Sequence, residues 1–215
     1  MSALVIAFVL SLIATLLVVR YSHLHEHMTA DYDMDGVQKF HSSPVPRVGG
    51  LGLVTGLVGA LGVRYFQHQE VGGFGLLLLL SAVPAFALGF IEDITKRVGV
   101  KVRLLATAAS AGLAGYLLGS WLSSLQILGI DDLMAHYPLF AIVVTCFAVA
   151  GVANAFNIID GYNGLSGMVG VIILGGIAYV AFQLNDFEIM IASIAMIGAI
   201  LGFFILNYPR GLIFL

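Results

Sequence analysis

The sequence predicts an all-α membrane protein, a polytopic bundle of about seven transmembrane helices. Hydrophobic residues make up 60% of the 215 residues and charged residues only 10%, whereas charged residues are typically about 25% of a soluble domain. The apolar residues form long runs without the alternation of a membrane β-strand, and a helix satisfies its own backbone hydrogen bonds in lipid. Because neither a linker nor an internal repeat interrupts the chain, residues 1–215 are expected to form a single transmembrane domain.

The apolar runs define the expected spans. The run from Met1 to Val19 has no charged side chain and no obvious cleavage site, so it is expected to be a retained anchor rather than a signal peptide. The second run is rich in glycine, which favours close helix packing, and Pro84 should bend the third run. The spans are expected at approximately residues 1–19, 48–63, 73–91, 104–121, 137–152, 165–184 and 189–206.

The positions of the basic residues indicate which face of the membrane is cytoplasmic. With seven spans, all but one of the nine Lys and Arg residues fall on one side, and only Arg64 falls on the other. The positive-inside rule makes the first side cytoplasmic and places the N-terminus outside. The connection that follows Asn154 is then expected to be cytoplasmic.

A polar stretch from Asn154 to Leu165 interrupts the apolar sequence. Gly161 and Gly164 favour the end of a helix and allow the backbone to approach a ligand closely. Asn and Asp side chains often do no more than terminate a helix, but four regularly spaced polar groups beside two glycines favour a binding site. These groups recur at steps of three, which keeps them on one side of a helix: Asn154, Asn157, Asp160 and Asn163.

Two adjacent carboxylates, Glu92 and Asp93, follow the third run and precede four cations. A carboxylate at a helix C-terminus is disfavoured by the helix dipole by up to about 1 kcal/mol, so a compensating charge is expected. Neutralisation by Lys96 and Arg97 four residues later is one interpretation. The other is that the carboxylates hold Mg²⁺, which usually takes one or two protein carboxylates and completes its shell with water and substrate oxygens.

Arg47 is presented at the start of the second run by Pro44 and Pro46, which stiffen the chain before it. The arginine could be a headgroup anchor or a substrate contact, and the sequence leaves both open. Two patterns further upstream favour no site. His23, His25 and His27 are typical of a solvated loop rather than a metal tract, and the stretch from Asp31 to Gly36 lacks the later Glu that a calcium loop requires.

Carboxylates, basic residues and amides are therefore expected together at one membrane face. This combination favours phosphoryl transfer between a soluble phosphorylated donor and a membrane-borne acceptor, because such catalysis depends mostly on positioning and on charge neutralisation. A transporter is the alternative from a different class. The charged groups lie at an interface and not near the midplane, where transporter sites form, and this disfavours a transporter.

Three motifs resemble, in order and spacing, the polyprenyl-phosphate N-acetylhexosamine-1-phosphate transferases, the MraY/WecA family or glycosyltransferase family 4. They are Pro46-Arg47-Val48-Gly49-Gly50 preceded by His41, Gly89-Phe90-Ile91-Glu92-Asp93, and the stretch from Asn154 to Leu165. The resemblance implies transfer of a hexosamine 1-phosphate from a UDP-sugar to polyprenyl (undecaprenyl) phosphate in the bacterial inner membrane. It further implies Mg²⁺ as cofactor, release of UMP, and a product that starts a cell-envelope glycan of the cell wall or lipopolysaccharide.

The resemblance also assigns residues to roles. It implies catalytic roles for Asp93, Glu92 and Asp160, with Asp93 and Asp160 at the metal. Glu92 stands where many members have Asp, and Asn163 where some members have Asp. The substrate contacts that it implies are Asn154, Asn157, Asn163, Arg47, Lys96, Arg103 and His41. The expected partners are the UDP-sugar, polyprenyl phosphate and membrane lipid, without nucleic acid, and homodimer formation is left open.

Members of the family usually have about ten spans and continue past a stretch like Asn207 to Gly211 into a Gly-Asp motif and a His-rich loop. Because the sequence ends at Leu215, the chain is expected to be the N-terminal portion of the catalytic domain, without one metal-binding Asp and without those histidines. Alone it is expected to have little or no activity, and an inactive membrane fragment is a further alternative.

Overall fold

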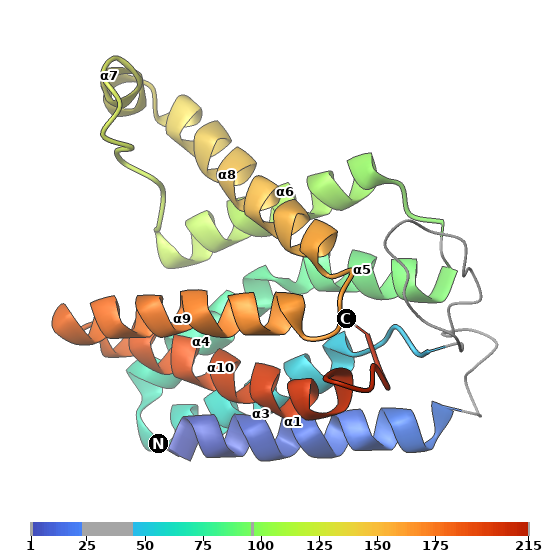
Figure 1. Ribbon diagram of the computed structural model, residues 1–215. Coiled ribbons are helices and arrows are strands. Elements are labelled where there is room, and N and C mark those ends of the chain that lie inside the picture. Colours follow the sequence, from blue (N-terminus) through green and yellow to red (C-terminus); the bar gives the residue numbers. More distant parts are fainter. Residues whose placement is uncertain (1, 23–44, 96, 215) are drawn as a thin grey trace. The chain divides into compact units, whose positions relative to one another are not determined.

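The computed structural model describes residues 2–22, 45–95 and 97–214 (Figure 1). In these ranges the chain forms helices and no β-strand, which confirms the predicted all-α class. The residues group into two compact units. Of the described residues, the first contains 2–22, 45–76, 93–95 and 158–214, and the second contains 77–92 and 97–157.

The first unit is built on α1 (Ser2–Arg20), α3 (Gly50–Gln67), α9 (Leu165–Gln183) and α10 (Phe187–Asn207). Helix α1 packs against α3 and α10, and α10 also contacts α3 and α9 (Figure 1). One side of α1 is buried at intervals of four residues, and each of these residues is small: Ala3, Ala7, Ser11 and Thr15. A stripe of small residues lets the helix backbones approach closely, as is usual where helices pack inside a membrane.

Glycines on the partner helices complete this packing. A Cβ atom at Gly56 of α3 would lie 2.6 Å from the backbone oxygen of Ala7, and a Cβ atom at Gly202 of α10 would lie 2.5 Å from that of Phe8. Ser11 Oγ donates a hydrogen bond to the backbone oxygen of Ala199 over 2.7 Å. The prediction that the glycine-rich second run packs closely is therefore confirmed.

The second unit contains most of α5 (Val83–Thr95), α6 (Val100–Leu118), α7 (Ile130–His136) and most of α8 (Pro138–Ile159). Buried hydroxyl groups connect its segments. Ser110 Oγ accepts a hydrogen bond from the backbone N–H of Ala85 over 3.0 Å, and Thr145 Oγ1 accepts one from the N–H of Leu122 over 3.0 Å. These bonds satisfy backbone donors that would otherwise be left unpaired in an apolar environment.

The third apolar run is bent. Helix α4 (Gln69–Ser81) and α5 meet at an angle of 48° around Ala82. Pro84, the second residue of α5, has no N–H to donate to the carbonyl four residues earlier, and its ring crowds that carbonyl. The predicted bend is confirmed.

The number of spans is lower than expected. Helices form at all seven predicted positions. Among the residues that the structure describes, however, only four helices are long and apolar enough to cross a membrane: α1, α8, α9 and α10. The bent pair α4–α5 would be a fifth span. Helix α6 carries Lys101 and Arg103 in its first turn and contains many small residues, and α3 contains Arg64 and several glycines. These residues lower the hydropathy of both helices below that of a typical span.

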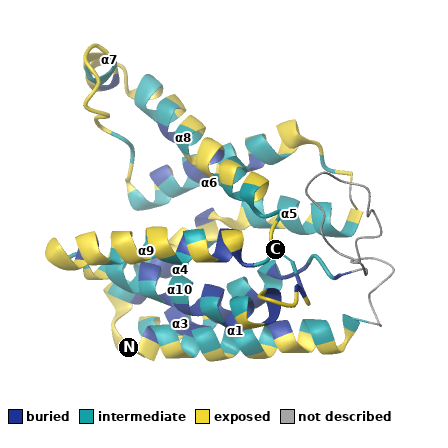
Figure 2. Cartoon of the chain, viewed as in Figure 1, coloured by how far each residue is buried: buried dark blue, intermediate teal, exposed yellow. Residues whose placement is uncertain are grey.

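Many large apolar residues are exposed, as expected in lipid, and exposed residues recur along α9 (Figure 2). Helix α9 buries mainly small residues, among them Ser166, Gly167 and Gly170, while it exposes large side chains such as Ile172 and Phe182. Such a surface would be unstable in water but suits the bilayer core. The chain is thus a multi-pass membrane protein.

Candidate active site

Helix α8 ends at Ile159, and a turn of residues 160–164 leads directly into α9 at Leu165. Gly164 adopts the left-handed conformation with φ of 78°, which only glycine adopts without strain. A Cβ atom at this position would also lie 2.9 Å from the Phe204 ring. The predicted helix end that opens into a tight polar loop is confirmed, and residues 160–164 are called the polar loop below.

Asp160 is the acidic group of the polar loop. Ser166 Oγ, in the first turn of α9, donates a hydrogen bond to its Oδ1 atom. Burial raises the pKa of Asp160 to about 6, while the Ser166 hydrogen bond and the positive charge of Arg47 oppose this rise. Folding therefore brings Arg47, which precedes α3, within electrostatic reach of a carboxylate that lies far from it in the sequence.

Asn207, the last residue of α10, holds the polar loop in place. Its side chain is buried, and both of its polar atoms are used. Oδ1 accepts a hydrogen bond from the backbone N–H of Gly164 over 2.6 Å, and Nδ2 donates to the backbone oxygen of Ile213 over 2.8 Å. Nearby, Asn163 Nδ2 donates to the backbone oxygen of Pro209 over 3.2 Å. The polar loop is thus bound to the chain that follows α10.

Residues 211–214 also bind the segment that carries Arg47. The N–H of Phe214 donates to the oxygen of Pro46 over 3.0 Å, and the N–H of Gly49 donates to the oxygen of Phe214 over 2.8 Å. Ile213 is fully buried and packs with Phe203 and Leu206 of α10. Residues 211–214, called the connecting segment below, therefore lie between the Arg47 segment and Asn207, which in turn holds the polar loop.

Two buried amide oxygens, one in each unit, lack partners among the described residues. Asn163 Oδ1 and, on α8, Asn154 Oδ1 are buried and accept no hydrogen bond from the residues that the structure describes. A buried oxygen left without a donor costs about 1–3 kcal/mol, and such groups in native proteins usually mark a place for water, an ion or a ligand. Asn157, by contrast, is exposed.

In the second unit, Glu92 pairs with a cation from the following helix. Arg103 Nη1 donates to Glu92 Oε1 over 3.0 Å and to Oε2 over 3.4 Å, and about a quarter of each side chain is exposed. The Glu92 charge is therefore compensated across α5 and α6, a pairing that the sequence analysis did not consider. Arg103 Nε is buried without a partner among the described residues.

Asp93, adjacent to Glu92, is half-buried and belongs to the first unit, as do Arg47 and Asp160. His41 and Lys96 lie outside the described residues. The same is true of His23, His25 and His27 and of the stretch from Asp31 to Gly36.

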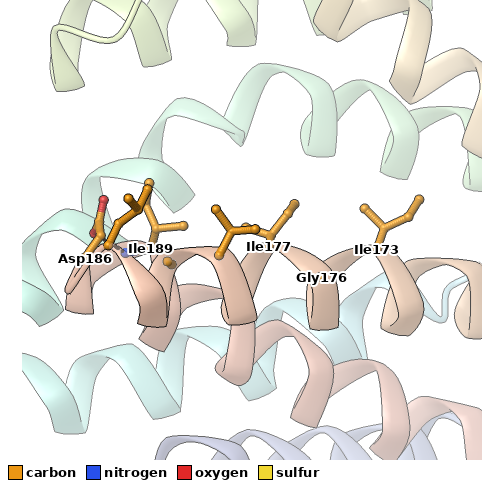
Figure 3. A pocket seen from close by; sticks show the side chains of 8 residues that line it. Ile173, Gly176, Ile177, Asp186 and Ile189 are labelled. Atoms are coloured by element: carbon orange, nitrogen blue, oxygen red, sulfur yellow. Dashed lines mark hydrogen bonds between the residues drawn. The ribbon is translucent and has the colours of Figure 1, made fainter.

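An apolar pocket of about 420 Å³ lies along the second half of α9 and the start of α10 (Figure 3). Ile173, Gly176 and Ile177 line it on α9, and its single acidic residue, Asp186, accepts a hydrogen bond from the N–H of Ile189 over 3.0 Å. Because the polar loop precedes α9, this pocket lies toward the other end of that helix. It contains no residue expected at the site.

A family model described as glycosyl transferase family 4 matches residues 75–215. The chain belongs to glycosyl transferase family 4. The match includes Glu92, Asp93 and the whole stretch from Asn154 to Leu165, so two of the three motifs lie inside it. The resemblance to this family is confirmed.

Curated relatives of this family 4 chain share the name phospho-N-acetylmuramoyl-pentapeptide-transferase. The Streptococcus mutans protein is 29% identical over 223 residues, which cover 98% of the chain and 65% of the relative. The Streptococcus pneumoniae protein is 26% identical, with 100% and 67% covered, and the Halalkalibacterium halodurans protein is 32% identical, with 80% and 56% covered. The chain thus spans between just over half and two thirds of the length of these relatives.

Two polar residues of the candidate site, Ser166 and Asn207, were not predicted from the sequence. Ser166 lies two residues after the polar loop, so its proximity to Asp160 could have been suggested by spacing alone. Asn207 was noted only as part of a family-like stretch. A buried Asn at the end of a long apolar run is a signal, because most buried amides in native proteins are hydrogen-bonded.

Proposed function

We propose that this family 4 chain acts in the transfer of a hexosamine 1-phosphate from a UDP-sugar to polyprenyl phosphate in the bacterial inner membrane, with release of UMP. One observation carries the proposal: a partly buried carboxylate, Asp160, stands just after the end of a membrane helix, within electrostatic reach of Arg47. The curated relatives are named for the transfer of a phospho-N-acetylmuramoyl-pentapeptide group, so a UDP-sugar that carries this group is the first donor to test. The product would start a cell-envelope glycan.

Mg²⁺ is the proposed cofactor. In the described ranges no three His, Cys, Asp or Glu side chains come together as a metal site, but Mg²⁺ needs only one or two protein carboxylates. Asp93 and Asp160 of the first unit offer two, and the unpartnered Asn163 oxygen offers a neutral acceptor in the same unit. When bound, the ion would offset the charge of the diphosphate.

The side chains of the polar loop would bind the soluble donor. Asn163 and, at the end of α8, Asn154 present buried oxygens that accept N–H or O–H groups of a base or a sugar, and the exposed Asn157 would add a third contact. Arg47, with Lys96 and His41, would contact phosphate groups. Because Arg103 is paired with Glu92, it would bind phosphate only through the donors that this pair leaves unused.

The reaction itself needs little covalent participation by the protein. The lipid phosphate would attack the β-phosphate of the donor in line, and Asp160 and Asp93 would position charge around the diphosphate. We place the polar loop on the cytoplasmic side and the N-terminus in the periplasm, on the seven-span arrangement in which α3 and α6 also cross the membrane and the basic connections share the side of the loop.

A chimera tests this assignment. Residues 1–215 would be joined to the remaining part of the Streptococcus mutans relative, and Mg²⁺-dependent release of UMP from the UDP-linked donor would be measured with polyprenyl phosphate in mixed micelles. Asp160→Asn and Asp93→Asn should each abolish the release, while Asp186→Asn, which changes a carboxylate at the start of α10, should not. Near-normal rates in either of the first two variants would refute the assignment.

A further inference from the structure

The connection between α6 and α8 is apolar and exposed. Helix α6 ends at Leu118 and α8 begins at Pro138, and no charged residue occurs from Leu104 until Asp131. Leu128 is fully exposed, and half of the Ile127 surface is exposed. The large apolar residues with exposed surface in this connection are Leu125, Ile127, Leu128, Leu133 and Tyr137.

Hydrogen bonds hold these apolar residues in a fixed loop. Asp131 Oδ1 accepts from the N–H of Leu125 over 2.7 Å, and Oδ2 accepts from Ser124 Oγ over 2.8 Å. These bonds lower the pKa of Asp131, so the carboxylate remains ionised and continues to accept them. At the start of the connection, the Trp121 ring packs so closely against Gly115 that a Cβ atom there would overlap it. The exposed leucines are therefore displayed by an ordered loop.

The loop must lie at the surface of the membrane. Only Tyr137 separates α7 from α8, and α8 is long and apolar enough to cross the bilayer. A helix of 22 residues is about 33 Å long, so the loop lies at the face opposite to the polar loop that follows Ile159. Trp121 and Tyr137, which flank the loop, are residue types enriched at membrane interfaces.

Helix α7 has one polar side. Asp132 and His136 are four residues apart and therefore lie on the same side of the helix, and His136 Nδ1 is hydrogen-bonded to the backbone oxygen of Asp132 over 2.8 Å. Met134 is buried against the rest of the unit, and Leu133 is exposed. An element with one polar side and one apolar side is suited to lie in the plane of the interface.

We propose that residues 121–137 form an interfacial anchor that inserts Leu125, Ile127 and Leu128 into phospholipid at the membrane face opposite the candidate active site. The lipid is favoured as the occupant because the loop adjoins a spanning helix, lacks charge at its tip and is held rigid without a covering segment in the second unit. The anchor would fix the depth and tilt of α8, which carries Asn154 and Asn157 at its other end. It does not depend on the proposed reaction.

The single tryptophan of the chain provides a direct test. In a Trp121→Phe background, Leu128→Trp would be the only tryptophan, and the full chain would be reconstituted in phosphatidylcholine vesicles with bromine atoms at defined acyl positions. An interfacial anchor buries its apolar side about 5–10 Å below the surface. Shallow bromines should therefore quench most of the Leu128→Trp fluorescence, deep bromines less, and aqueous iodide little.

The matched control is His136→Trp in the same background, on the polar side of α7. It should emit at longer wavelength, be quenched by iodide and be quenched less by bromolipid. Equal bromolipid quenching of both variants, or iodide quenching of Leu128→Trp, would overturn the proposal. Protection from both quenchers would indicate cover by a second copy and would overturn it too.

A second reporter keeps the test independent of the tryptophan changes. In a Cys146→Ser background, a nitroxide on Leu128→Cys should be relaxed more by dissolved oxygen, which concentrates in lipid, than by a water-soluble nickel chelate. The reverse ratio would contradict lipid insertion.

Discussion

Replacement of Asn207 by alanine should release both the polar loop and the connecting segment. The change removes the acceptor for the Gly164 N–H and the donor for the Ile213 oxygen, and both backbone groups are buried. Each unsatisfied buried group costs about 1–3 kcal/mol. Since about 1.4 kcal/mol corresponds to a factor of ten, opening at each position should become easier by roughly 5- to 150-fold.

Hydrogen exchange followed by mass spectrometry measures this opening directly, because local exchange reports local opening. Peptides that contain residues 160–166 and 211–214 should exchange faster in Asn207→Ala, whereas peptides from α6 should be unchanged. Asn207→Asp keeps an acceptor for Gly164 but loses the donor to Ile213, so its larger effect should fall on residues 211–214. The control is Asn157→Ala, which removes an exposed amide.

Exchange in both peptides of Asn207→Ala that matches Asn157→Ala would refute the reasoning. It would mean that the two hydrogen bonds do not hold the polar loop and the connecting segment. Faster exchange throughout the chain would mean that Asn207 supports the whole first unit and not this region alone.

Three further predictions concern residues of the first unit. Asp160→Asn should raise the thermal stability of the chain in detergent near pH 7. The folded pKa of about 6 lies above the ordinary value of about 3.9, so ionisation opposes folding by about 2–3 kcal/mol at neutral pH. This gain should shrink as the pH falls from 6 to 4, and a gain that persists at pH 4 would contradict the burial argument. Ser166→Ala should move the acidic limb of the pH–activity profile of the chimera to higher pH, because the hydroxyl favours the ionised carboxylate; Ser166→Thr should restore the profile. Gly56→Ala should lower the free energy of unfolding by roughly 1–3 kcal/mol through a clash with Ala7, and the melting temperature should fall with it. Gly62→Ala, with open space around it, should be neutral or stabilising by up to about 1 kcal/mol, and equal effects of the two would exclude close packing at Gly56.

Local features of the fold were predictable. The bend at Pro84, the close packing of the glycine-rich helix and the helix end before Gly164 each follow from the chemistry of one or two residues. The number of spans was predicted too high, because α3 and α6 look apolar as runs but carry Arg64, Lys101 and Arg103 and many small residues. The span count was predicted from the lengths of the apolar runs, and length alone does not account for the residues that lower the hydropathy of these two helices.

The sequence by itself determined the all-α membrane class, the polar loop and the family, since these depend on composition, on periodicity and on short motifs. Only the tertiary structure decided that Asn207 binds Gly164, 43 residues earlier, that the connecting segment pairs with Pro46 and Gly49, and that Arg103 neutralises Glu92. The physical reason is that hydrogen bonds and ion pairs between distant segments have no period in the sequence. They form only after the helices pack and bring buried donors and acceptors together.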